Sequence, residues 1–305
     1  MDIVGLNSVV FAAQDIGAAR RFCSDFGLTE LEHGESGTTF EALDGTSVVI
    51  RSPEDAALPP ANVSGSTARE TVWGVSDKST LRRIGAELTR DRPVREDGAG
   101  VLHTVDDDNQ SIAFELNRRR PYGAEPHPHN VAGLPEGRAL NERVSFSGKP
   151  MARTLGHVVY WTYDAARSMK FYVERLGFRI TDSYERNTGI FARAAGSQEH
   201  HNIFFVGQDR FPPSFQHLEF AFGDVQEVMI NGAQLSAKGW KTAMGPGRFT
   251  LGSNWYWYFV TPLGGNFEMA ADMDRVDDNW KPGVWKPSPE VLGWRLRVND
   301  APILF

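Results

Sequence analysis

The sequence has little cysteine, no long apolar run and no block of charge of one sign. Its single cysteine, Cys23, excludes an internal disulfide framework and fits a reducing compartment. No apolar stretch approaches the roughly 20 residues that span a bilayer, and the first residues lack the basic and apolar regions of a signal peptide. We therefore expect a cytoplasmic protein that does not enter a membrane.

The charged residues are interspersed, with a formal net charge of −7. No cluster of Lys and Arg favours nucleic acid or an anionic membrane surface, so we expect a small-molecule partner instead. A length of 305 residues suits two domains of ordinary size, and 41% hydrophobic residues are enough to fill two cores.

An internal repeat organises the chain. Residues 6–11 with 18–28 resemble residues 155–160 with 168–178, and each set predicts a strand, a turn, a helix and a glycine stop. Apolar residues at i, i+3, i+4 and i+7 give each helix one stripe. The stripes are Ala19, Phe22, Cys23 and Phe26 in the first copy and Met169, Tyr172, Val173 and Leu176 in the second. Gly27 and Gly177 stand where a left-handed residue would end each helix.

Strand-like segments follow each helix, and a related repeat begins at residue 70 in the first half and at residue 217 in the second. The chain therefore predicts an α+β fold of four βαβββ modules. Periodicity disappears between residues 118 and 149, where Pro, Gly and charged residues dominate. We expect a two-module domain over residues 1–120, a linker over 121–150, a two-module catalytic domain over 151–275 and an irregular tail over 276–305.

Three residues of the second half can bind a metal, and each lies in a short strand-like segment. They are His157, His217 and Glu268. Two imidazoles and one carboxylate on one face of an octahedral ion leave the opposite face open, which is the arrangement with which a non-haem iron(II) takes up substrate and dioxygen. The pattern indicates an oxygen-using enzyme.

Four βαβββ modules with this triad resemble the vicinal oxygen chelate superfamily, and the second half is similar to the type I extradiol catechol dioxygenases. The resemblance implies two cup-like domains, of which only the C-terminal one holds metal, with His157, His217 and Glu268 as ligands. It implies iron(II), with manganese(II) as the alternative metal, a homo-oligomer, and ring cleavage of a catechol-type aromatic diol by O2.

Further residues match the same family. The segment Glu199-His-His-Asn resembles its His-His strand and maps the catalytic acid/base to His201, while Tyr258 stands at the place of its active-site tyrosine. The alternative for His201 is a structural histidine on a strand, with adjacent His200 pointing to the opposite face. The alternative for Tyr258 is a tyrosine that packs in the core. Phe249 departs from the pattern, because a histidine commonly stands there. Phenylalanine in place of histidine removes one hydrogen-bond donor from the substrate pocket, which puts any substrate preference inherited from the family in doubt.

The first half lacks an equivalent triad. The positions opposite the three ligands hold Asn7 or Ser8, then Glu70, then Ala113 or Glu115, depending on the alignment of the strands. No register supplies two imidazoles, so we expect a metal-free structural cup. His127 and His129 form a His-x-His pair in a Pro-rich stretch, where a solvated loop is the better interpretation.

Two other functions stay open for the same fold. One is a glyoxalase-like isomerase or lyase in which the metal acts as a Lewis acid; such relatives usually have a fourth protein ligand, which the sequence does not show. The other is a protein that binds an aromatic ligand without chemistry. The sequence also leaves open which diol is bound and whether cleavage is proximal or distal.

Overall fold

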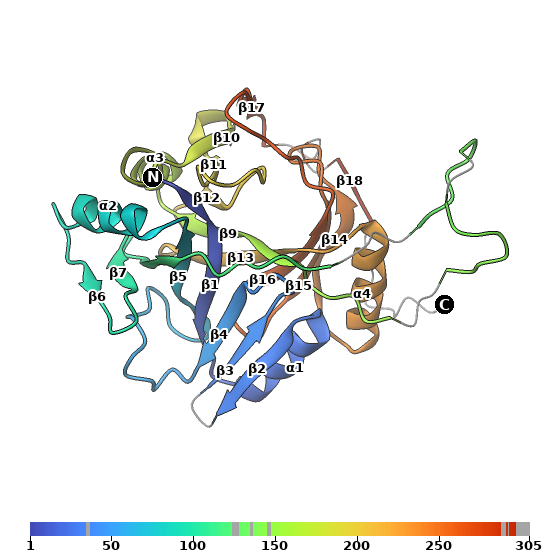
Figure 1. Cartoon of the computed structure of the whole chain (residues 1–305), viewed down its shortest axis with the longest axis horizontal. Coiled ribbons are helices and arrows are strands. Elements are labelled where there is room, and N and C mark those ends of the chain that lie inside the picture. Colours follow the sequence, from blue (N-terminus) through green and yellow to red (C-terminus); the bar gives the residue numbers. More distant parts are fainter. Residues whose placement is uncertain are drawn as a thin grey trace.

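The computed structural model describes residues 1–34, 37–123, 128–134, 137–144, 148–287, 291 and 293–296. Its helices and strands follow the predicted order, four times over: one strand, one helix and three strands (Figure 1). The α+β class with four βαβββ modules is therefore confirmed. No helix among the described residues is long and apolar enough to cross a bilayer.

The first half forms an eight-stranded sheet of order β2-β3-β4-β1-β5-β8-β7-β6. Its first module comprises β1 (Ile3–Ala12), α1 (Ile16–Phe26), β2 (Thr29–Gly34), β3 (Gly37–Glu41) and β4 (Ser47–Arg51). The second comprises β5 (Thr67–Val75), α2 (Lys78–Leu88), β6 (Arg95–Glu96), β7 (Leu102–Val105) and β8 (Ser111–Leu116). The first strands of the two modules, β1 and β5, pair antiparallel and join the modules into one sheet.

The second half repeats this plan in a ten-stranded sheet of order β17-β10-β11-β12-β9-β13-β16-β15-β14-β18. Its first module comprises β9 (Thr154–Thr162), α3 (Ala165–Leu176), β10 (Arg179–Tyr184), a 3-10 turn η1 (Glu185–Asn187), β11 (Gly189–Arg193) and β12 (Ile203–Gly207). The next comprises β13 (Ser214–Ala221), α4 (Val225–Ala237), β14 (Thr242–Arg248), β15 (Trp255–Val260) and β16 (Asn266–Ala271). Here β9 and β13 make the antiparallel join.

Each α-helix of the described residues begins at an aspartate whose side chain accepts a backbone N–H of the first turn, which satisfies a donor that the helix leaves unpaired. Gly27 and Gly177 end α1 and α3 in the left-handed region, with φ of 106° and 80°. The stripe of α1, including Cys23, is buried in the core. The predicted stripes and stops of these two helices are confirmed.

The C-terminal segment is not wholly irregular, and that prediction is wrong at two places. β17 (Gly283–Trp285) pairs with β10, and β18 (Trp294–Arg295) pairs with β14, so the segment extends both edges of the second sheet (Figure 1). The edge strands of a sheet carry unpaired N–H and C=O groups that accept another strand. Strands this short have too little periodicity to be visible in the sequence.

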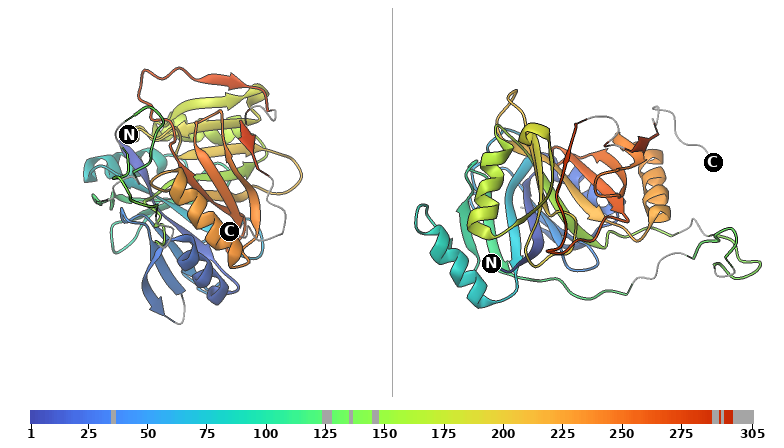
Figure 2. Two further views of the ribbon diagram at one scale, coloured as in Figure 1. Left: turned by 90° about the vertical axis from the view of Figure 1, so that its right-hand side faces the viewer. Right: turned by 90° about the horizontal axis from the view of Figure 1, so that it is seen from above.

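The two halves pack together through aromatic side chains. Phe11 of β1 lies edge-on to Phe215 of β13 with ring centroids 5.1 Å apart, and Phe26 of α1 contacts Phe220 at 5.5 Å. The described part of residues 121–150 contains no helix or strand and extends away from the sheets (Figure 2). His129 is exposed there, and His127 lies outside the described residues. The domain limits stay a prediction.

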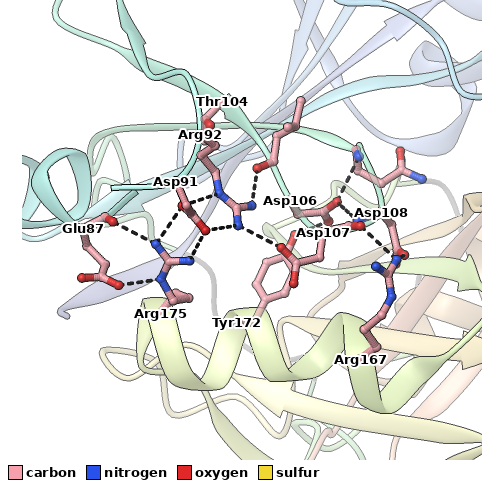
Figure 3. Close-up of polar contacts among 12 residues, drawn as sticks. Glu87, Asp91, Arg92, Thr104, Asp106, Asp107, Asp108, Arg167, Tyr172 and Arg175 are labelled. Carbon is pink, nitrogen blue, oxygen red and sulfur yellow. Dashed lines mark hydrogen bonds and ion pairs between the residues drawn. The ribbon is translucent and has the colours of Figure 1, made fainter. Parts of the chain in front are cut away.

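A polar network joins the same halves at another place. Arg175 of α3 pairs with Glu87 of α2 and with Asp91, and Arg167 of α3 pairs with Asp108 in the turn between β7 and β8 (Figure 3). The network lies on the α3 side of the interface, so the two halves are connected by charges as well as by the apolar core.

Candidate metal centre

The three predicted ligands come from three adjacent strands of the second sheet. His157 lies on β9, His217 on β13 and Glu268 on β16, and β13 stands between the other two. Within the sheet, Glu219 of β13 is the register partner of both His157 and Glu268, so these three residues form one row. His217 precedes Glu219 by two residues, which puts it on the same face.

The ligand atoms of the triad converge. Nε2 of His157 lies 3.0 Å from Nε2 of His217, and Oε2 of Glu268 lies 3.4 Å and 3.2 Å from these two nitrogens. Adjacent ligands of an octahedral ion with bonds of about 2.1 Å are separated by about 3.0 Å. No other set of three such residues converges in this way in the described part of the chain.

Hydrogen bonds and burial prepare the triad for a cation. All three side chains are buried. Burial lowers the pKa of His157 to about 4, so its imidazole is neutral above that pH. Burial raises the pKa of Glu268, but hydrogen bonds and charge interactions with His157 and His217 outweigh this and lower it to about 2. A neutral imidazole and a carboxylate are the forms that bind metal.

Each ligand has a supporting neighbour. Nδ1 of His217 faces the side-chain oxygen of Gln216, and Oε1 of Glu268 accepts a hydrogen bond from Asn254 at 3.1 Å. Nδ1 of His157 lies 3.6 Å from Oε2 of Glu219, which is beyond hydrogen-bond distance. A polar group behind a ligating side chain orients it toward the ion. The residues therefore fit a divalent cation.

The triad lines one end of a cavity with about 410 Å³ of empty space, its mouth included. His201, Tyr258 and Phe249 line the same cavity. The structure thus brings together all six residues that the sequence singled out. The apolar part of the lining comes mainly from β10, β11, β12 and the segment after β14: Tyr184, Phe191, Phe204, Leu251 and, from the C-terminal segment, Val291.

His201 stacks against a predicted metal ligand. Its ring centroid lies 4.1 Å from that of His157, with the planes tilted by 32°. Burial, together with the neighbouring imidazoles, holds the pKa of His201 well below its usual range, so the ring is neutral. His200 does not point away from it, because residues 200–202 form a bend before β12 rather than part of a strand. The two Nδ1 atoms lie 3.0 Å apart, and the alternation expected of a strand does not apply.

Tyr258 and Phe249 stand on the side of the cavity beside Glu268. Tyr258 is the register partner of Glu268 on the neighbouring strand β15, and its ring lies edge-on to His217 at 5.1 Å. Burial and the charge of Glu268 hold the pKa of Tyr258 well above its usual range, so the phenol keeps its proton. Phe249 stacks on Tyr256 at 4.0 Å and offers the cavity an apolar face.

In the first half, the corresponding strands carry other pairs of polar side chains in contact. The amide of Asn7 donates to Glu115 at 3.0 Å, and Glu70 lies 2.8 Å from Nδ1 of His103. His103 was not anticipated, since it follows Glu70 by more than thirty residues. The absence of metal from this cup stays a prediction.

Two supporting residues of the centre were also missed. Glu219 could have been found, because a residue two positions after His217 on a strand shares its face. Asn254 could not, because it lies in a loop before β15 and reaches Glu268 only through the fold.

Comparison with known proteins agrees with this geometry. Residues 154–269 match the family model of the Glyoxalase/Bleomycin resistance protein/Dioxygenase superfamily. Metapyrocatechase 2 of Cupriavidus necator is 26% identical over 288 residues, which cover 94% of this chain and 87% of that protein. The predicted resemblance to the vicinal oxygen chelate superfamily and its extradiol dioxygenases is confirmed.

Solved structures show the same fold at lower identity. The Mn(II)-bound glyoxalase of Novosphingobium aromaticivorans superimposes with a TM-score of 0.75 at 20% identity, covering 95% of this chain and 90% of that one. The 2,3-dioxygenase LapB of Pseudomonas sp. KL28 superimposes with a TM-score of 0.74 at 16% identity, covering 94% and 98%. Relatives named for two different reactions therefore share this architecture.

Proposed function

We propose that this chain, whose residues 154–269 match the family model of the Glyoxalase/Bleomycin resistance protein/Dioxygenase superfamily, is an iron(II)-dependent extradiol dioxygenase that cleaves a catechol-type diol with O2. The convergence of His157, His217 and Glu268 at the end of a cavity with an apolar wall carries the proposal. These residues would hold the ion on one face. The similarity to metapyrocatechase 2 supports the substrate class.

Iron(II) would supply open coordination positions at which a diol and dioxygen meet, which overcomes the slow reaction of triplet oxygen with organic molecules. The cavity would hold the aromatic ring against its apolar wall, where Phe191 and Phe204 stack on each other with centroids 3.7 Å apart. Such a wall excludes water from the bound ring.

The roles of the remaining polar residues follow from their positions in the cavity. His201 lines the cavity beside His157, where its imidazole would accept a proton from the diol and return it later in the reaction. Tyr258 keeps its proton and would donate a hydrogen bond to a substrate oxygen as charge develops there. Phe249 donates nothing, so the neighbouring part of the ring is recognised by shape.

A second candidate is a glyoxalase-like isomerase or lyase, because a Mn(II)-bound glyoxalase shares the fold. In that reaction the metal acts as a Lewis acid and oxygen is not consumed. The three-ligand set favours the dioxygenase, since within the described residues no fourth side chain joins the converging ligand atoms.

The test is oxygen uptake by purified protein loaded anaerobically with ferrous iron. On addition of a catechol we expect one O2 consumed per diol and a visible chromophore from the ring-opened product. Manganese(II)-loaded protein and a metal assay of the protein as purified identify the metal. Turnover of a chelating substrate without oxygen, or no oxygen uptake from a broad set of catechols by fully metallated protein, would contradict the proposal.

Glu268→Gln provides the matched control. It keeps the size of the side chain and the hydrogen bond from Asn254 but removes the charge that the ion requires. We expect the variant to fold, to bind little iron and to consume no oxygen. The aromatic diol and O2 as substrates, a homo-oligomer and a cytoplasmic location stay predictions beside this proposal.

A further inference from the structure

Three buried side chains connect the cavity of the metal centre with the C-terminal segment. Nδ1 of His201 lies 3.0 Å from Nδ1 of His200, and Nε2 of His200 lies 2.7 Å from Oδ2 of Asp182 on β10. Their exposed fractions are 6%, 0% and 2%. Water does not compete for these hydrogen bonds, so each one sets the direction of the next.

The carboxylate of Asp182 is oriented by β17. Its Oδ1 accepts the backbone N–H of Gly283 at 2.6 Å and the indole N–H of Trp285 at 3.0 Å. These two donors occupy one oxygen and leave the other for His200. Trp280 adds support, because its indole donates to the carbonyl oxygen of Thr181 at 2.7 Å and its ring lies edge-on to His200.

The position of each proton follows from the donors and acceptors. An ionised carboxylate only accepts, so Nε2 of His200 carries a hydrogen. A neutral imidazole has one N–H, so Nδ1 of His200 is an acceptor and Nδ1 of His201 must donate to it. Nε2 of His201 then has a free lone pair, and it is the ring nitrogen that remains for the cavity.

We propose that Asp182 and His200 are positioning residues that hold His201 in the tautomer whose Nε2 can accept a proton from a bound diol. The proposal rests on the dioxygenase function for its consequence, whereas the hydrogen bonds exist in the protein without metal or diol. β17 is part of this arrangement, because it fixes the carboxylate of Asp182. Three successive hydrogen bonds therefore connect the C-terminal segment with His201.

In the competing arrangement, the hydrogen of His201 is on the other ring nitrogen. If His200 were a cation, it would donate from both nitrogens, and Nδ1 of His201 would accept. Nε2 of His201 would then carry a hydrogen and could not act as a base. The two arrangements differ in which nitrogen of His201 is protonated, and this can be measured directly.

Asp182→Asn reverses the hydrogen bonds while keeping the shape of the side chain. The amide oxygen must take the place of Oδ1, where two N–H groups point at it. The NH2 group then faces Nε2 of His200 and donates to it. His200 becomes the Nδ1–H tautomer, Nδ1 of His201 accepts, and Nε2 of His201 gains the hydrogen. A wrong tautomer at intact geometry has large effects in other enzymes with an Asp–His pair.

The first measurement is a long-range 1H–15N correlation spectrum of the imidazoles in metal-free protein, with His201 assigned from a His201→Gln variant. We expect the Nδ1–H tautomer of His201 in the wild type and the Nε2–H tautomer in Asp182→Asn. An Nε2–H tautomer in the wild type, or the same tautomer in both proteins, would overturn the proposal.

Asp25→Asn is the matched control. Asp25 also accepts an indole N–H, from Trp240 at 2.9 Å, and it lies in α1 of the other half. The same chemical change at this place should leave the tautomer of His201 and the activity unchanged.

The second measurement is turnover by the iron-loaded variants. We expect kcat of Asp182→Asn to fall by about 10²- to 10⁴-fold, the range of general acid–base catalysis, with iron content and KM for the diol nearly unchanged. Trp285→Phe removes one of the two donors to Oδ1 and should give a smaller loss of kcat, so it serves if Asp182→Asn does not fold.

The two proposals fail in different ways. If the wild type cleaves no catechol, the dioxygenase function is wrong, while the spectra still decide the tautomer. If the wild type cleaves catechol and Asp182→Asn cleaves it equally fast, the function stands and the positioning role of Asp182 and His200 is refuted.

Discussion

Asp106 gives a pH-dependent stability that can be calculated from its surroundings. It lies in the turn between β7 and β8 with 3% of its surface exposed. Oδ1 accepts the N–H groups of Asp108 and Gln110 at 2.9 Å and 3.0 Å, and Oδ2 accepts the hydroxyl of Tyr172 of α3 at 3.0 Å (Figure 3). Burial, and then the charge of Asp108, raise its pKa from 3.8 to about 7.

A raised pKa means that the folded state favours protonated Asp106. Its contribution to stability is fully present below the unfolded pKa near 3.8 and is lost as the pH rises through about 7. With these two values, linkage gives a loss of about 2.5 kcal/mol between pH 5 and pH 8. The loss reflects the cost of a buried charge beside Asp108.

Asp106→Asn should remove this dependence. The amide oxygen keeps both backbone hydrogen bonds, and the NH2 group donates to Tyr172, so the variant resembles the protonated aspartate. We expect the variant to gain stability relative to the wild type as the pH rises, by about 2.5 kcal/mol from pH 5 to pH 8. Urea unfolding of metal-free protein at several pH values, followed by circular dichroism, measures the difference.

Asp107→Asn in the same turn is the control. The carboxylate of Asp107 is half-buried and pairs with Arg92 at 2.9 Å, so its replacement should shift stability by a similar amount at every pH. A stability difference between Asp106→Asn and the wild type that stays constant from pH 5 to pH 8 would refute the reasoning. It would mean that Asp106 is already ionised throughout this range in the folded protein.

Two further predictions concern packing and metal. A Cβ on Gly232 of α4 would lie 2.1 Å from the buried ring of Trp257. Gly232→Ala should therefore lower the free energy of unfolding by about 1–3 kcal/mol, measured by urea unfolding. Gly98 has open space around it, so Gly98→Ala should change the free energy of unfolding little. Added iron(II) or manganese(II) at 100 times the dissociation constant should stabilise the wild type by about 2.7 kcal/mol. Glu268→Ala should lose this gain in a thermal unfolding assay, and an equal gain in the variant would show that the ion binds elsewhere.

The sequence by itself determined the modules and the three side chains that converge. The stripe from Ala19 to Phe26 and the glycine at residue 27 define a helix with one buried face, because helical geometry repeats every 3.6 residues. His157, His217 and Glu268 occupy related strands of repeated modules, so the topology of the repeat predicts their convergence. These features are local or repeated, and a single chain displays them without its fold.

Only the tertiary structure decided how the centre is supported. Asp182 meets His200 from another strand and Gly283 from a segment about a hundred residues later, and no local pattern links them. The bend at residues 200–202 turned His200 toward His201, against the alternation that a strand would impose. Hydrogen bonds between distant residues depend on how sheets and edges meet in space, which the periodicity of each segment does not encode.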